Sequence, residues 1–319
     1  MPVSRNEYNE KSKGGTELSI AELEAHVDSD LLSKFQIIPS RFRGLEEGLI
    51  PLYWLHDLAD DPEMHHLADG GWRKFRKLVF VSNWQMQQFI LRYNIPWQQC
   101  VQINNGIVPF PKPKAGQSKW DVKDGAYRFI YHTTPHRGLN VLAAVFPALR
   151  TRWPRITLDV YSSFSIYGWN ERDRDYQDLY NTLASTPGVT YHGARSNEEI
   201  RAACEAAHFF LYPCTWPETG CRALIEAMMA GVYCVHSNFG CLYETALGRT
   251  AMYQYHEDLN DHANIAYISA SRVLQTVADL EPKAVERTLA SVRATAELNY
   301  SWPAMIGPSW NRFLRSQIG

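Results

Sequence analysis

Residues 208–244, HFFLYPCTWPETGCRALIEAMMAGVYCVHSNFGCLYE, decide the fold of this chain. The apolar run 208–213 is typical of a buried parallel strand. A turn and a helical pattern over 219–230 follow, and Gly231 stands where a helix commonly ends. A second apolar run, 232–236, completes a β-α-β unit. The stretch therefore predicts a parallel sheet that is covered by helices.

Two carboxylates, Glu218 and Glu226, flank this helical pattern. The backbone N–H groups of a helix start are free and attract an anion, most naturally a phosphate. The amides concerned are those of Thr219, Gly220, Cys221 and Arg222. Gly220 has no Cβ, so a ligand can approach the backbone closely, and each carboxylate can accept two hydrogen bonds from a vicinal diol. The arrangement suits a diphosphate with a hydroxyl-bearing ring at each end, which is the shape of a nucleotide sugar.

An alternative interpretation makes both carboxylates ordinary helix charges. Glu218 would then favour the helix dipole, and Glu226 would belong to a solvated face. The neighbours of Glu226, at 223–225 and 227–230, are all apolar. Because a lone carboxylate in a mostly buried helix needs a partner, the pattern favours a binding role.

The segment resembles the C-terminal signature of the retaining, GT-B-fold glycosyltransferases of family 4, the group 1 glycosyltransferases. Their motif is a Glu, seven residues, a second Glu and a helix end of small residues; here it reads Glu218-TGCRALI-Glu226-AMMAG. The resemblance implies an α/β protein of two Rossmann-like domains facing across a cleft, with the N-terminal domain reduced. It implies transfer of a sugar from a nucleoside-diphosphate sugar, with UDP the first choice, to an acceptor hydroxyl with retention of configuration. We expect no cofactor and no metal ion.

The same resemblance gives roles to residues of the motif. It implies that Glu218 contacts the donor sugar near the reacting carbon and that Glu226 binds the ribose hydroxyls. The backbone amides that would hold sugar and phosphate are those of Thr219, Gly220 and Cys221. Family members usually carry Phe-Gly after the first Glu, where this chain has Thr219-Gly220.

Arg137 is the candidate for neutralising the leaving group. It follows a strand pattern and a turn in the stretch 131–142, YHTTPHRGLNVL, at the start of a helix. A guanidinium binds phosphate through two hydrogen bonds and neutralises a departing diphosphate, whereas a merely solvated arginine there would oppose the helix dipole. Family members often have a second Arg five residues earlier, where this chain has His132, which is therefore a further candidate for donor binding. The resemblance therefore puts diphosphate stabilisation mostly on Arg137 and backbone amides, and it places Glu244 in a loop that helps enclose the nucleotide.

The N-terminal part of the chain offers two further candidates. Gly14 and Gly15 precede a helical pattern and match the family's glycine-rich loop, which faces the donor, although no convincing strand precedes them. His56 follows the strand pattern 50–55, and open α/β sheets bind ligands at that end of a strand. A histidine satisfied within the core is the alternative for His56, and a common turn is the alternative for the glycines.

A basic cluster at 72–77, Trp-Arg-Lys-Phe-Arg-Lys, precedes another strand pattern. We predict a solvated helix face. Contact with anionic lipid or with a phosphate-bearing acceptor is the functional alternative.

The prolines and glycine of 109–116 mark a linker. We predict an acceptor-side domain over 1–108, a linker over 109–126 and a nucleotide-sugar-binding domain over 127–300. The tail 301–319 would return as a helix to the first domain, with Pro308 kinking or splitting it.

Composition excludes several other classes of protein. A chain of 319 residues with 45% hydrophobic content can fill two cores, and its net charge of −2 argues against nucleic-acid binding. No apolar run approaches the roughly 20 residues of a membrane span, the polar N-terminus does not read as a signal peptide, and the six cysteines form no CxxC pair. We expect a cytoplasmic protein, with peripheral membrane contact as an open alternative. Its expected partners are a nucleotide sugar and a glycan, lipid-linked or protein acceptor.

Two other functions compete with sugar transfer. A catalytically inactive sugar-nucleotide or glycan-binding protein could keep the same site; the short first domain and His132 favour it, whereas Glu218, Glu226 and Arg137 disfavour it. A Rossmann oxidoreductase would need Gly-x-Gly-x-x-Gly after the first strand, which the chain lacks.

Overall fold

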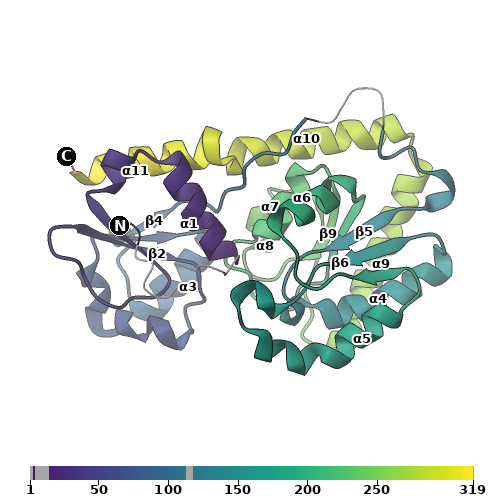
Figure 1. The fold of residues 1–319 in the computed structure, drawn as a ribbon, viewed down its shortest axis with the longest axis horizontal. Helices are drawn as coiled ribbons and strands as arrows, with labels where there is room; N and C mark the ends of the chain where they lie inside the picture. Colours follow the sequence, from purple (N-terminus) through teal and green to yellow (C-terminus); the bar gives the residue numbers. More distant parts are fainter. Residues whose placement is uncertain (1–2, 4–13, 113–117, 319) are drawn as a thin grey trace.

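The computed structural model describes residue 3, residues 14–112 and residues 118–318. Two α/β bodies lie side by side, and the last two helices run along both of them (Figure 1). Each body is built around its own parallel sheet, one of four strands and one of six. This is the doubly wound architecture that the alternating strand and helix patterns predict.

The N-terminal sheet has the order β1-β2-β3-β4. Its strands are β1 (Phe35–Pro39), β2 (Ile50–Leu55), β3 (Lys77–Phe80) and β4 (Cys100–Gln102). The elements packed around it are α1 (Gly15–His26), α2 (Ser29–Leu32), the 3₁₀ segment η1 (Pro62–Lys74) and α3 (Asn83–Tyr93). Val3 pairs with Ile37 of β1 in an isolated parallel bridge. The strand that the sequence does not show before the glycine loop is therefore represented, among the described residues, by this one buried valine.

The C-terminal sheet has the order β10-β9-β8-β5-β6-β7. Its strands are β5 (Arg128–Tyr131), β6 (Thr157–Val160), β7 (Val189–Tyr191), β8 (Phe209–Tyr212), β9 (Tyr233–Ser237) and β10 (Ala251–Tyr253). Its helices are α4 (Leu139–Arg152), α5 (Gln177–Ser185), α6 (Asn197–Ala206), α7 (Arg222–Met229), α8 (Leu242–Thr245), α9 (Leu259–Asp279) and α10 (Pro282–Tyr300). The strand order reverses between β5 and β8, and such a switch point opens a ligand-binding crevice at the carboxyl ends of the strands.

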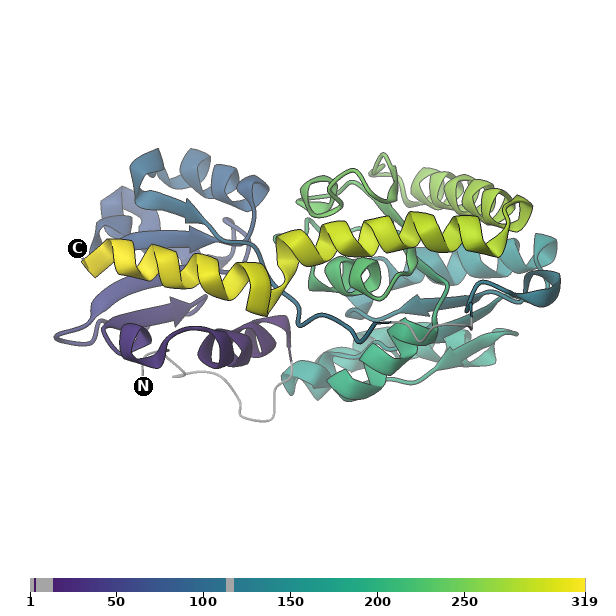
Figure 2. The same ribbon diagram turned by 90° about the horizontal axis from the view of Figure 1, so that it is seen from above.

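The C-terminal helices join the two bodies (Figure 2). Helix α10 ends at Tyr300, after which Ser301 bridges to Ile107 at the end of the N-terminal domain. A short π segment, Trp302–Ile306, leads into α11 (Gly307–Ile318). Trp302, Ile306, Trp310 and Leu314 are buried in the core cluster of the N-terminal sheet.

The expectation that Pro308 kinks or splits the last helix agrees with the structure, in which the tail is divided into the π segment Trp302–Ile306 and α11 immediately before this proline. Pro308 is the second residue of α11 and has no backbone N–H to continue the hydrogen-bond pattern of the π segment. The chain changes direction earlier, at Ser301, because the backbone N–H of Ile107 donates to the carbonyl of Tyr300 (2.8 Å) and that of Trp302 donates to the carbonyl of Ile107 (3.2 Å). Among the described residues, no helix has the length and apolar character needed to cross a membrane.

Candidate active site

Glu218 lies at the switch point of the C-terminal sheet, in the turn that follows β8. Its backbone pairs with Gly240 in an isolated parallel bridge, and its carbonyl accepts a hydrogen bond from the N–H of Cys241 (2.7 Å). Only 4% of Glu218 is exposed. The loop after β9 therefore fixes the backbone of Glu218, and the carboxylate is held at the carboxyl end of β8.

Arg137 reaches Glu218 from the neighbouring strand β5. Its Nη1 donates to Oε1 of Glu218, the hydroxyl of Tyr212 donates to the same oxygen, and Nε donates to Oγ1 of Thr134 (3.1 Å). Burial disfavours the charged guanidinium, but Glu218 raises the pKa of Arg137 above its ordinary value. Nη2 of Arg137 and Oε2 of Glu218 make no hydrogen bond with a described residue. The pair therefore keeps one donor group and one acceptor atom for a ligand.

Gly138 explains how Arg137 comes so close to β8. It adopts φ +100°, and a Cβ at this position would lie 2.0 Å from the carbonyl oxygen of Pro213. Only glycine combines this backbone conformation with such a contact. The turn before α4 therefore packs closely against Pro213, the residue that follows β8.

Glu226 has the partner that its apolar neighbours predict. It lies on α7, and its Oε2 is 3.5 Å from Nε2 of His132, which directly follows β5. Both residues are buried. Burial disfavours the imidazolium, but Cys204 and Glu226 raise the pKa of His132; burial likewise opposes the carboxylate, while His132 lowers the pKa of Glu226. His132 thus contacts the carboxylate that the family resemblance assigns to ribose.

Helix α7 is shorter than the pattern 219–230 predicts. It begins at Arg222, and Cys221 is its N-cap residue. The three preceding amides belong to a turn that contacts the N-terminal domain: Oγ1 of Thr219 donates to the carbonyl of His56 (2.7 Å), and Nδ2 of Asn105 donates to the carbonyl of Gly220 (2.8 Å).

The missing Cβ of Gly220 makes room for the N-terminal domain. A Cβ there would lie 2.7 Å from Cγ2 of Val81 and 2.8 Å from Nδ2 of Asn105. The close fit against Val81 and Asn105 is therefore a second reason for glycine at this position, beside the approach of a ligand. Binding of a donor by the Gly220 amide stays a prediction.

The N-terminal candidates face the same region from across the domain interface. Gly15 begins α1, and a Cβ there would lie 3.3 Å from Cδ of Arg222, while a Cβ on Gly14 would lie 2.1 Å from Cε1 of Tyr167. His56 directly follows β2, as expected. Its Nε2 is buried without a described partner, and burial and Arg222 lower the pKa of His56 to about 3, so the ring is neutral.

Several contacts at this interface have no signal in the local sequence pattern. Glu244 accepts hydrogen bonds from the N–H of Asn83 (2.8 Å), Nδ2 of Asn83 (3.0 Å) and the N–H of Trp84 (3.0 Å). A carboxylate of the C-terminal domain thereby caps α3 of the N-terminal domain, a position that suits its charge. Glu244, which the family resemblance places in a nucleotide-enclosing loop, contacts the other domain in this structure. Tyr212, Asn105 and Arg222 are further site residues that sequence reasoning does not assign a side-chain role.

Replacing Glu244 with Ala is expected to weaken the contact between the domains. The change removes three hydrogen bonds to an ionised group, at a cost of about 2 kcal/mol. We expect a larger radius of gyration in small-angle X-ray scattering and faster hydrogen exchange at the Asn83 and Trp84 amides. Glu281→Ala is the control, because Glu281 is exposed and its side chain makes no cap bond. The same radius and exchange rates in Glu244→Ala and the wild type would contradict the interpretation.

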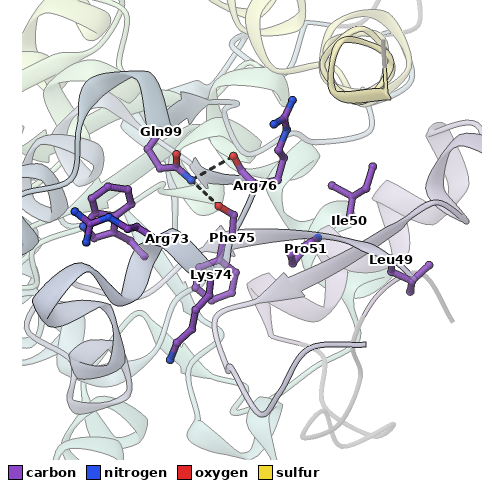
Figure 3. A pocket seen from close by; sticks show the side chains of 9 residues that line it. Leu49, Ile50, Pro51, Arg73, Lys74, Phe75, Arg76 and Gln99 are labelled. Carbon is purple, nitrogen blue, oxygen red and sulfur yellow. Dashed lines mark hydrogen bonds between the residues drawn. The ribbon is translucent and has the colours of Figure 1, made fainter. Parts of the chain in front are cut away.

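The basic cluster 72–77 lies away from these residues. An open hollow of about 620 Å³ is lined by Leu49, Ile50, Pro51, Trp72, Arg73, Lys74, Phe75, Arg76 and Gln99 (Figure 3). Nε2 of Gln99 donates to the carbonyl of Phe75 (2.6 Å). These residues precede or begin strands β2, β3 and β4, so the hollow lies at the opposite edge of the sheet from His56. Contact of this cluster with anionic lipid or with a phosphate-bearing acceptor stays an untested alternative to the predicted solvated face.

The comparisons with known proteins agree with this architecture. Residues 128–265 match the family model described as "Glycosyl transferases group 1". None of the curated proteins matches the chain. A glycosyltransferase from Rickettsia africae ESF-5 is 15% identical, with a TM-score of 0.67 over 98% of this chain and 84% of that one. HepE from Anabaena, in complex with UDP and glucose, is 15% identical, with a TM-score of 0.63 over 94% of this chain and 82% of that one.

A third solved structure extends the similarity to another glycosyl-transferring enzyme. Sucrose-phosphate synthase from Thermosynechococcus elongatus is 16% identical, with a TM-score of 0.62 over 89% of this chain and 74% of that one. At such identities the similarity concerns the fold. Residues 128–265 are therefore similar to a group 1 glycosyltransferase domain, and the chain as a whole has the two-domain GT-B fold.

Proposed function

We propose that the protein transfers a sugar from a nucleoside-diphosphate sugar to an acceptor hydroxyl, with retention of configuration. The observation that carries the proposal is the pairing of Arg137 with Glu218 at the switch point of the C-terminal sheet. The two residues are far apart in sequence and lie in the turns that follow two neighbouring strands, β5 and β8. The start of α7 and then Glu226 follow Glu218 in the sequence.

The pair is suited to a reaction in which a diphosphate departs. The bond between the anomeric carbon and the phosphate oxygen breaks, and the diphosphate keeps the electron pair. The acceptor oxygen bonds to the anomeric carbon, and its proton passes to the departing diphosphate. Arg137 can meet the growing negative charge through Nη2, and the start of α7 adds backbone N–H groups. Preorganised positive groups of this kind are a principal source of catalysis.

The carboxylates orient the donor in this proposal. Oε2 of Glu218 accepts a hydrogen bond from a hydroxyl of the donor sugar, and Glu226 accepts hydrogen bonds from the ribose. His132 acts through Glu226, because their 3.5 Å contact fixes that carboxylate. Gly14, Gly15 and His56 complete the site from the N-terminal domain. No step is assigned to a metal ion or cofactor.

UDP is the first choice of nucleotide. HepE from Anabaena was solved with UDP and glucose, and the pneumococcal O-GlcNAc transferase GtfA was solved with UDP and GlcNAc. GtfA is 12% identical to this chain, so it supports only the choice of a first ligand to test.

The competing function is a binding protein that keeps the site without turnover. Nothing in the contacts of Arg137, Glu218 and Glu226 favours it. A binder would show saturable affinity for a nucleotide sugar without formation of a nucleoside diphosphate.

Thermal-shift screening is expected to show stabilisation by one of UDP-, GDP- or ADP-sugars. At a ligand concentration of about 100 times Kd, binding to the native state adds about 2.7 kcal/mol to the free energy of unfolding. The same samples are then assayed for release of the free nucleoside diphosphate. Stabilisation with release supports the enzyme, stabilisation without release supports the binder, and no stabilisation by any donor would overturn both.

A further inference from the structure

Arg222 is a cation of the candidate site to which sequence reasoning assigns only a backbone role. It is the first residue of α7, and its side chain crosses into the N-terminal domain. Nη1 donates to the carbonyl of Gly106 (2.8 Å) and to Oγ of Ser19 (3.1 Å). Ser19 in turn donates to the carbonyl of Gly15 (2.8 Å). Arg222 is thereby connected to the glycine loop at the start of α1.

The partners of Arg222 are all neutral. No carboxylate of a described residue lies within ion-pairing distance of the Arg222 guanidinium. The guanidinium of Arg137, by contrast, is paired with Glu218. The nearest acidic groups, Glu226 and Glu22, favour the charge less than burial disfavours it, so burial lowers the pKa of Arg222. A largely buried guanidinium without an anion is costly. An anionic ligand would supply the missing charge.

We propose that Arg222 is a second cationic contact for the donor's phosphates, in addition to Arg137. The inference rests on the proposed function. Arg222 starts the helix whose free N–H groups already favour an anion, and its Cδ lies 3.3 Å from the place of a Cβ on Gly15. A phosphate bound at the start of α7, beside the glycine loop, would meet this guanidinium. Nε and Nη2 make no hydrogen bond with a described residue and remain available.

This assignment fits the position of His132. His132 stands where family members often have an arginine, and here it contacts Glu226. Arg222 restores a second positive charge from a different element. Because Nη1 also contacts Gly106 and Ser19, phosphate binding at Arg222 and the approach of the N-terminal domain become coupled.

The test compares binding of UDP, uridine and pyrophosphate to the wild type and to Arg222→Met, by isothermal titration calorimetry. GDP with guanosine and ADP with adenosine are used in parallel, because the base is not assigned. We expect Arg222→Met to lower the affinity for the diphosphates and for pyrophosphate at least tenfold. The affinity for the nucleosides should change less than twofold. Arg222→Lys keeps the charge and should recover part of the loss. Arg155→Met, at an exposed arginine paired with Asp124, is the matched control and should change nothing.

The outcomes distinguish a failure of the role proposed for Arg222 from a failure of the proposed function. Unchanged diphosphate affinity in Arg222→Met would overturn the role of Arg222, and so would an equal loss for nucleoside and diphosphate, which indicates a general effect on the fold. Equal losses in Arg222→Lys and Arg222→Met would also contradict a charge contact. A wild type that binds none of the three diphosphates and no pyrophosphate would overturn the proposed function itself.

Discussion

Arg137→Ala and Glu218→Ala are each expected to lower the turnover number more than tenfold, which is above about 1.4 kcal/mol of transition-state stabilisation. Arg137 offers the departing diphosphate its positive charge, and Glu218 holds the sugar that is transferred. The two side chains form a hydrogen-bonded ion pair, so removing either one also removes a contact that holds the other in place. The loss is expected mainly in kcat, because the charge on the diphosphate grows as the bond breaks.

The measurement is steady-state release of nucleoside diphosphate from the donor identified by thermal shift. Arg137→Lys keeps a charge but loses the bidentate geometry, so its activity should lie between those of the wild type and Arg137→Ala. Arg155→Ala is the control for a general loss of arginine, and thermal unfolding of each variant checks the fold. A turnover number like that of the wild type in Arg137→Ala or Glu218→Ala would remove the role assigned to that residue.

Gly240→Ala is expected to destabilise the protein and to displace Glu218. Gly240 adopts φ +66°, and a Cβ there would lie 2.3 Å from the backbone nitrogen of Glu218 and 2.4 Å from its carbonyl oxygen. Neither atom can move without breaking the bridge between Glu218 and Gly240. We expect a cost of several kcal/mol, beyond the roughly 1–2 kcal/mol for any alanine in this backbone conformation.

Gly248 provides a matched control for this change. It adopts φ +65°, and nothing lies within 4 Å of the place of a Cβ. Gly248→Ala therefore carries the backbone strain without the contact. Thermal midpoints and donor affinity are compared for the two variants. Equal midpoints and equal affinities would show that the contact with Glu218 does not fix the site.

Much of the architecture follows from periodicity alone. Strand β2 occupies the residues 50–55 of its pattern, and β8 and β9 begin and end within one residue of the runs 208–213 and 232–236. Strand β10 has only three residues, Ala251–Tyr253, too few for a periodic pattern to reveal. The late start of α7 could not be predicted from the local sequence either, because the carbonyl of Gly220 accepts a hydrogen bond from Asn105, which is 115 residues away. Local patterns therefore predict elements well where local energetics decide them.

The candidate site is predictable only in part, for the same reason. The motif Glu218-TGCRALI-Glu226 indicates the two carboxylates. The apolar residues on both sides of Glu226 indicate that this carboxylate needs a partner. The identity of that partner, His132, depends on the adjacency of β5 and β8. The contact of Arg222 with Ser19 spans 203 residues, and that of Glu244 with Asn83 spans 161. Such contacts depend on how two domains meet, which no pattern along one segment contains.

A crystal structure of the protein with UDP bound tests the central claim most directly. We predict phosphate oxygens about 3 Å from the amides at the start of α7 and from the guanidinium of Arg137. The ribose should lie at Glu226, and Glu218 should face the vacant place of the sugar. UDP bound elsewhere, with the start of α7 empty or with Glu218 and Glu226 directed into different cavities, would contradict the account.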